Sequence, residues 1–168
     1  ASLTGHLVFS TLHTNDAASA VTRLVDMNVE PFLVSSSVIG MLAQRLVRRV
    51  CPACREPVVP TETELAQLGY TRERFLAETP GHVYRATGCQ ECLDNGYKGR
   101  TGIYELLLVN DEVRHLVMQN VDSNTLKKHA IRNGMTTLRD DGALKVMQGI
   151  TTIEEVLRVT QDDMLSLD

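Results

Sequence analysis

Two C-x-x-C pairs are the feature that most constrains this chain. Cys51-Pro-Ala-Cys54 and Cys89-Gln-Glu-Cys92 use every cysteine in the 168 residues. Two such pairs offer four thiolates from two chelating corners, which suits a tetrahedral Zn²⁺ site. The 34-residue spacer between the pairs is long for a zinc ribbon, but doubling a loop costs only about 0.6 kcal/mol. Because structural zinc binding supplies about 10–16 kcal/mol, the sequence predicts a tetracysteine metal site.

Other chemistries for these cysteines are less consistent with the sequence. Disulfides or free buried thiols are the simplest alternatives, but no secretion signal opens the chain to favour disulfides. A dithiol redox motif needs one pair and leaves the second unexplained. Iron in the same four-sulfur cage is not distinguished from zinc by the ligands alone. A closed tetracysteine site has no open coordination position, so we expect a structural or partner-presenting role rather than a catalytic one.

Composition argues against nucleic-acid binding and against a membrane span. The chain has seven aromatic residues, no Trp and a net charge of -4, so it lacks stacking platforms and a basic footprint. The longest apolar-leaning run, residues 31–44, is too short to cross a bilayer. We therefore expect no nucleic-acid partner and no transmembrane segment, and a zinc-ribbon nucleic-acid binder is disfavoured.

Local patterns predict a mixed α/β chain. Residues 6–12 are typical of a buried strand. The helix expected after this strand has apolar residues on one face, and Thr14, Asn15 or Asp16 can serve as its N-cap. A strand followed at once by a helix is typical of an α/β layer with a parallel sheet. Pro31 opens a second predicted helix toward Gln44, and residues 45–50 favour a strand.

The rest of the chain carries clear start and stop signals for helices. Capping boxes are predicted at 61–64 and 152–155, with Gly69 ending the first short helix. A strand is predicted at 101–108. Further helices are predicted from 110 or 111, over 123–134 and over 138–148. This part of the chain therefore predicts a strand followed by a small helical bundle.

Five histidines are present, and two of them bracket the predicted first strand. On the residues alone, His6 and His13 are as consistent with one packed and one solvated side chain as with a functional pair. For the other three the structural role is preferred; they are His82, His115 and His129.

Several motifs together resemble the type II/type IV secretion ATPases. Residues 5–17, with Arg23-Leu24 following, are similar to the histidine box of that family. The similarity continues over nearly the whole chain, through 43–48, both cysteine pairs, 99–105, 134–142 and 149–160. It is closest to the type II secretion ATPases, with the type IV pilus-assembly ATPases as near neighbours. Pilus-retraction ATPases share the histidine box but lack such cysteines.

The resemblance implies a RecA-like, hexameric motor at the cytoplasmic face of the inner membrane. It would couple ATP hydrolysis, with Mg²⁺, to pseudopilus assembly, and it would contact the inner-membrane secretion platform. The implied fold is α/β: a partial RecA-like core with the histidine box at 1–50, a tetracysteine zinc module at 51–100, and a strand plus C-terminal helical subdomain at 101–168. His6 and His13 fall on the histidine box and take a nucleotide-sensing role. Arg45 and Arg48 match core positions, although salt links explain them equally well.

The phosphate-binding motif of such an ATPase is missing from this sequence. A P-loop reads G-x-x-x-x-G-K-[ST], and none of the four lysines follows a glycine. The chain opens at Ala1 rather than at a Met, so we expect the C-terminal part of a longer protein, with the magnesium-binding segment upstream. The parent is expected to hydrolyse ATP and this chain alone to be inactive. The alternative from another functional class is a zinc-stabilised docking module without a nucleotide role.

Overall fold

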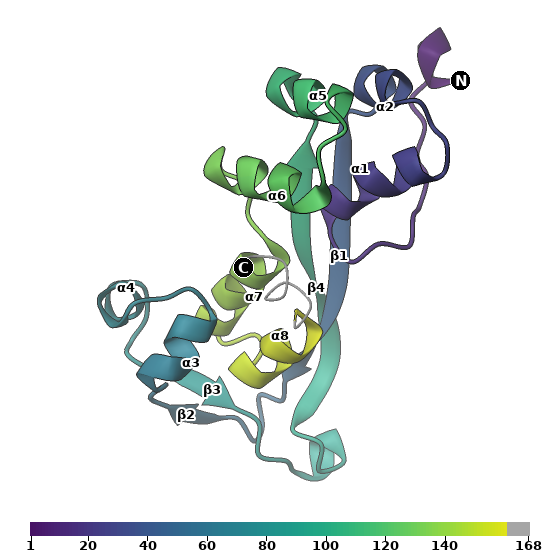
Figure 1. The fold of residues 1–168 in the computed structure, drawn as a ribbon. Coiled ribbons are helices and arrows are strands. Elements are labelled where there is room, and N and C mark those ends of the chain that lie inside the picture. Colours follow the sequence, from purple (N-terminus) through teal and green to yellow (C-terminus); the bar gives the residue numbers. More distant parts are fainter. Residues whose placement is uncertain (161–168) are drawn as a thin grey trace. The chain divides into compact units, whose positions relative to one another are not determined.

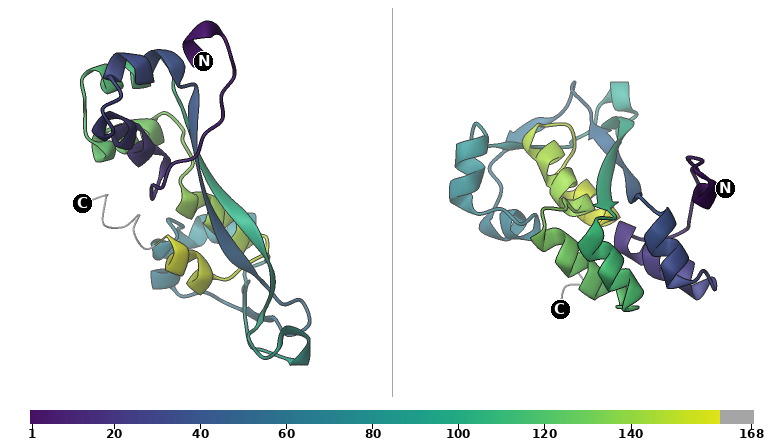
Figure 2. Two further views of the ribbon diagram at one scale, coloured as in Figure 1. Left: turned by 90° about the vertical axis from the view of Figure 1, so that its right-hand side faces the viewer. Right: turned by 90° about the horizontal axis from the view of Figure 1, so that it is seen from above.

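The computed structural model describes residues 1–160, which divide into two compact units (Figure 1). Unit 1 joins residues 1–43 to 105–137, and unit 2 joins residues 44–104 to the described residues from Leu138 onward. Two long strands, β1 (Gly40–Val50) and β4 (Tyr97–Leu108), contribute residues to both units. They pair with each other in a two-stranded sheet and run side by side in both views of Figure 2.

Unit 1 is a helical cluster packed against one end of β4. Its elements are η1 (Ser2–Thr4), α1 (Ala17–Asp26), α2 (Pro31–Ser37), α5 (Asp111–Met118) and α6 (Ser123–Arg132). Helix α1 packs on α6 and α2 packs on α5 (Figure 1). The core lies where the inward faces of these helices meet β4, and it includes Ala18, Val21, Val34, Leu107, Val113 and Leu126.

The strand predicted at residues 6–12 is wrong. This segment has no regular secondary structure, and its side chains are largely exposed, with Phe9 at 89%. A strand needs the backbone groups of a neighbour, and segment 6–12 joins neither of the two sheets formed by the described residues. A buried strand followed by α1 is therefore not part of the observed fold.

The helix predicted from Pro31 to Gln44 is too long. Helix α2 ends at Ser37, and the hydroxyls of Ser35 and Ser36 donate to the carbonyl oxygen of Phe32 over 3.0 Å and 2.7 Å. Such back-bonding competes with helix continuation, and Val38 takes an extended conformation. Residues 40–44 belong instead to β1, so the strand predicted at 45–50 is confirmed but starts earlier.

Unit 2 contains the cysteine segment and the last two helices. Its further elements are β2 (Glu56–Val58), α3 (Glu62–Gln67), α4 (Arg72–Glu78), β3 (Val83–Arg85), η2 (Gln90–Cys92), α7 (Leu138–Met147) and α8 (Ile153–Val159). Phe75 and Leu65, both fully buried, pack with Val146 and Val156 in one core. The spacer between the cysteine pairs is thus a folded piece of this core, and the sequence patterns missed β2, β3 and α4.

The predicted helix boundaries are otherwise mostly correct. The capping box at Thr61 and Glu64 is present, and Asn110 caps α5 through the N–H of Val113. The strand predicted at 101–108 lies within β4. The cap of α6 is Asp122, one residue before the predicted start.

Candidate metal centre and histidine segment

The four cysteines come together at one place in unit 2. All four sulfur atoms lie within 4.8 Å of one another. The Cys92 Sγ is 3.8 Å from both the Cys54 Sγ and the Cys89 Sγ. A tetrahedral Zn²⁺ with Zn–S bonds of about 2.3 Å has sulfur–sulfur edges of about 3.8 Å. The cysteines are free thiols rather than disulfides, so the arrangement matches the donor set of one tetrahedral metal ion.

Strand pairing inside the spacer brings the two cysteine pairs together. β2 and β3 are antiparallel, with Glu56 opposite Arg85 and Val58 opposite Val83. Next to this pairing, the Thr87 hydroxyl donates to the carbonyl oxygen of Cys54. The backbone therefore closes the 34-residue spacer by hydrogen bonding, in addition to any closure by a metal.

Backbone N–H groups donate hydrogen bonds to two of the four sulfur atoms. Gly88 donates to the Cys54 Sγ at 3.3 Å, and Cys89 and Gly96 donate to the Cys92 Sγ at 3.2 Å each. Burial opposes the charge on Cys92, but these N–H groups prevail and lower its pKa to about 7. Burial raises the pKa of Cys89 to about 11. Because the thiolate is the metal ligand, donors placed on the sulfurs suit a metal centre.

Two glycines beside the cysteines are required by the backbone. Gly88 has φ of 113°, and a Cβ there would lie 2.8 Å from the Asp94 carbonyl oxygen. Gly96 has φ of 75°, and a Cβ there would lie 2.7 Å from the Ala86 Cβ. Only glycine combines left-handed backbone with such close approach. Sequence reasoning missed both, although a glycine lies just before the second pair and another lies shortly after it.

The histidine segment lies in unit 1 along two open grooves. His6 is exposed, with its Nδ1 3.1 Å from the Thr4 hydroxyl, and it lines a groove of about 570 Å³. His13 is also exposed, and its neighbours Leu12 and Thr14 line a second groove of about 710 Å³. Both volumes fall in the range of small-molecule sites.

Buried charges hold the end of this segment where α1 begins. Asp16 accepts from the Ser19 N–H at 2.8 Å and from the Lys127 Nζ at 2.9 Å. Burial opposes its charge, but these hydrogen bonds prevail and lower the pKa of Asp16. Glu105, also buried, accepts from the Ala17 N–H at 2.9 Å. Sequence reasoning found Asp16 as a cap and missed Lys127, whose signal is a lysine next to Leu126 on the buried face of α6.

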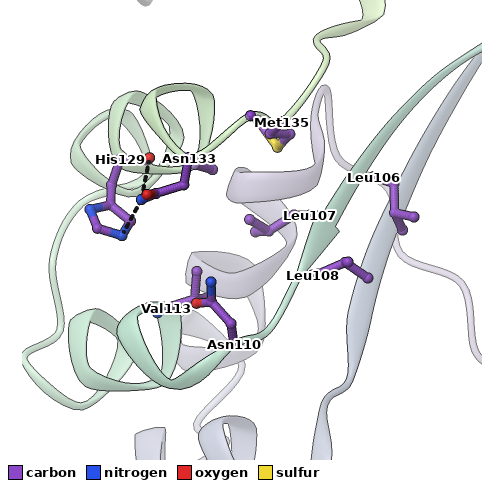
Figure 3. Close-up of a pocket in the computed structure, with 10 residues that line it drawn as sticks. Leu106, Leu107, Leu108, Asn110, Val113, His129, Asn133 and Met135 are labelled. Atoms are coloured by element: carbon purple, nitrogen blue, oxygen red, sulfur yellow. Dashed lines mark hydrogen bonds between the residues drawn. The ribbon is translucent and has the colours of Figure 1, made fainter.

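A smaller pocket of about 170 Å³ lies between β4, α5 and α6 (Figure 3). His129 lines it, and its Nε2 is 2.9 Å from the Asn133 Nδ2 and 3.1 Å from the Glu112 Oε2. The Glu112 contact links α6 to α5, whereas Asn133 is the C-cap residue of α6 itself.

No helix in residues 1–160 is long and apolar enough to cross a membrane.

Comparison with known proteins places the chain in a family. Residues 1–158 match the family described as type II/IV secretion system protein, and the chain belongs to it. It is 53% identical over 97% of its length to type II secretion system protein E of Pseudomonas aeruginosa, of which it covers 31%. It is 53% identical over 96% of its length to type II secretion system ATPase E of Vibrio cholerae, again covering 31%. It is 52% identical over 95% of its length to the type IV pilus assembly ATPase PilB of Thermus thermophilus, covering 18%.

Proposed function

We propose that this chain is part of an ATPase that powers type II protein secretion by assembling a pseudopilus. The observation that carries the proposal is the 53% identity, over nearly the whole chain, to proteins named type II secretion system protein E and type II secretion system ATPase E. The chain spans 31% of the length of those relatives. ATP hydrolysis is therefore proposed for the full-length protein and not for this chain alone.

In this proposal residues 1–50 belong to a RecA-like core that works as a hexamer with ATP and Mg²⁺. His6 and His13 sense the nucleotide, since an exposed imidazole can donate a hydrogen bond to a phosphate oxygen. The exposure of both rings supports this role, as do the groove that His6 lines and the groove lined by the neighbours of His13, Leu12 and Thr14. The motor would act from the cytoplasmic face of the inner membrane, against proteins of the secretion platform and not against nucleic acid.

The metal centre is proposed to hold one structural zinc ion. Its ligands would be the sulfurs of Cys51, Cys54, Cys89 and Cys92, which form a closed set. When bound, zinc supplies a fixed cross-link rather than catalysis. The N–H group of Gly88 donates to the Cys54 sulfur, and those of Cys89 and Gly96 donate to the Cys92 sulfur, so the chain's own backbone supports two of the four ligands.

The proposal is tested by comparing the full-length protein with the 168-residue chain. We expect magnesium-dependent phosphate release from the full-length protein and none above blank from the chain alone, because the chain's sequence has no P-loop. Full-length protein without turnover would refute the ATPase function. ATP turnover by the 168-residue chain alone would refute the proposal that hydrolysis requires the P-loop that this sequence lacks.

Type IV pilus assembly is the second candidate, because the Thermus thermophilus relative is 52% identical, close to the secretion proteins. Deletion of the gene in its own organism separates the two. Loss of protein secretion with intact pili supports type II secretion, and loss of pili with intact secretion supports pilus assembly.

A further inference from the structure

The feature that carries a further inference is a buried ion pair in unit 1. The Lys127 Nζ lies 2.9 Å from the Asp16 Oδ2, and the two side chains are 1% and 10% exposed. The residues are 111 positions apart in the chain. Removing one partner of such a pair leaves an uncompensated buried charge, whereas apolar replacement of a whole pair is often neutral for stability. A buried pair is therefore weak evidence for a purely stabilising role.

Capping of α1 does not by itself require Lys127. Asp16 satisfies the Ser19 N–H directly, and the neighbouring helix α6 is capped in the same way by Asp122, whose side chain is exposed. Lys127, on α6, adds an ion pair that fixes the position of the Asp16 carboxylate relative to α6. Glu105 on β4 fixes the next residue, since it accepts from the Ala17 N–H. The first turn of α1 is thereby held from two other elements.

The held turn directly follows the histidine segment. His13 is three residues before Asp16, and the Thr14 hydroxyl donates to the carbonyl oxygen of Asp16 over 3.2 Å. The position of Asp16 therefore determines where residues 13–15 lie as the chain enters α1.

We propose that Lys127 is a positioning residue that sets the place of His13 through Asp16. This inference rests on the proposed ATPase function and on the nucleotide-sensing role of His13. It makes α6 a part of the nucleotide response, although Lys127 on this helix lies 111 residues downstream of Asp16.

The test uses the full-length ATPase with Asp16→Asn/Lys127→Met as the decisive variant. Asn retains the N-cap, Met fills the lysine's space and both charges of the pair are removed together. The unfolding temperature of the variant is measured beside its turnover, so that a loss of stability is recognised as such. We expect kcat to fall at least about tenfold with KM for ATP changed less than about threefold, because misplacing a catalytic group mainly lowers the rate of chemistry. The matched control is Lys128→Met, an exposed lysine on the same helix, which is expected to keep wild-type turnover.

Hydrogen exchange on the same proteins gives a readout that does not depend on turnover. In the double variant we expect faster exchange at the amides of residues 13–19, with α5 unchanged. Wild-type kcat together with unchanged exchange at 13–19 would overturn the inference, as would a fall in kcat matched by Lys128→Met. A wild-type protein without turnover would instead refute the proposed function, while the exchange experiment would still decide whether Lys127 holds this turn.

Discussion

The guanidinium of Arg48 on β1 donates to the buried carboxylate of Glu155 on α8, through Nε at 3.0 Å and Nη2 at 2.7 Å. The Arg48 N–H also donates to Glu155, over 3.0 Å, and Arg158 donates two further hydrogen bonds to it. The capping box predicted at 152–155 is therefore only half right. Thr152 caps α8 by accepting from the Glu155 N–H, but the Glu155 side chain joins α8 to the strand. Arg48 thus has the salt-link role that the sequence left open.

This carboxylate predicts a pH dependence of stability. Burial opposes ionisation of Glu155, but hydrogen bonds from Arg158 and Arg48 prevail and lower its pKa from 4.5 to about 2. A group with a lowered folded-state pKa stabilises the fold above its unfolded pKa and loses that effect as the pH falls toward the folded value. We expect a contribution of about 1–3 kcal/mol at neutral pH that disappears between about pH 4.5 and 2.

The measurement is the free energy of unfolding of wild type and Glu155→Gln at several pH values. Acid would also release any metal held by the four cysteines, equally in both proteins, so the difference between them isolates Glu155. The difference should shrink as the pH falls through this range. A difference independent of pH would contradict the prediction.

Removing one sulfur ligand tests the metal centre. Cys54→Ser is expected to lower bound zinc from close to one per chain, because three thiolates hold the metal much more weakly than four. It should also make the remaining thiols reactive and lower the unfolding temperature. Elemental analysis and a thiol reagent measure these effects, with chelator-treated wild type as the reference. A wild-type chain that is fully folded without metal would refute a structural zinc role.

Gly96→Ala is expected to destabilise unit 2 by roughly 2–4 kcal/mol, because its left-handed backbone disfavours any side chain and the new Cβ would press against Ala86. Gly69→Ala is the matched control, because Gly69 has φ of 73° and a Cβ there would meet no atom within 4 Å. The control should lose only the backbone contribution of about 1–2 kcal/mol. Equal losses in urea unfolding would show that the close approach at Gly96 is unimportant.

His13→Ala separates nucleotide sensing from stability. Because the His13 side chain is exposed, its removal should change the free energy of unfolding by less than about 0.5 kcal/mol. On the proposed function, we expect ATP turnover of the full-length protein to fall by at least about tenfold. His115→Ala, an exposed histidine on α5, serves as the control and should leave turnover unchanged. Unchanged turnover in His13→Ala would return His13 to a structural role.

The sequence predicted best those features, such as helix caps and helix ends, that depend on residues close together in the chain. The cap at Asn110, the capping box at Thr61 and the ends of α6 and α7 depend on contacts within one turn, so local patterns contain the information. Segment 6–12 has the same kind of local signal for a strand, but strand formation requires a partner elsewhere.

The sequence by itself determined the two C-x-x-C pairs and most helix caps, because spacing and local chemistry specify them. Its motifs also determined the secretion family. Only the tertiary structure decided the distant partners of buried charges. Asp16 meets Lys127 across 111 residues and Glu155 meets Arg48 across 107, and no local pattern relates such positions. The same holds for the β2–β3 pairing that closes the cysteine spacer. Charges buried in a core must find partners, but which partners they find depends on how distant segments pack.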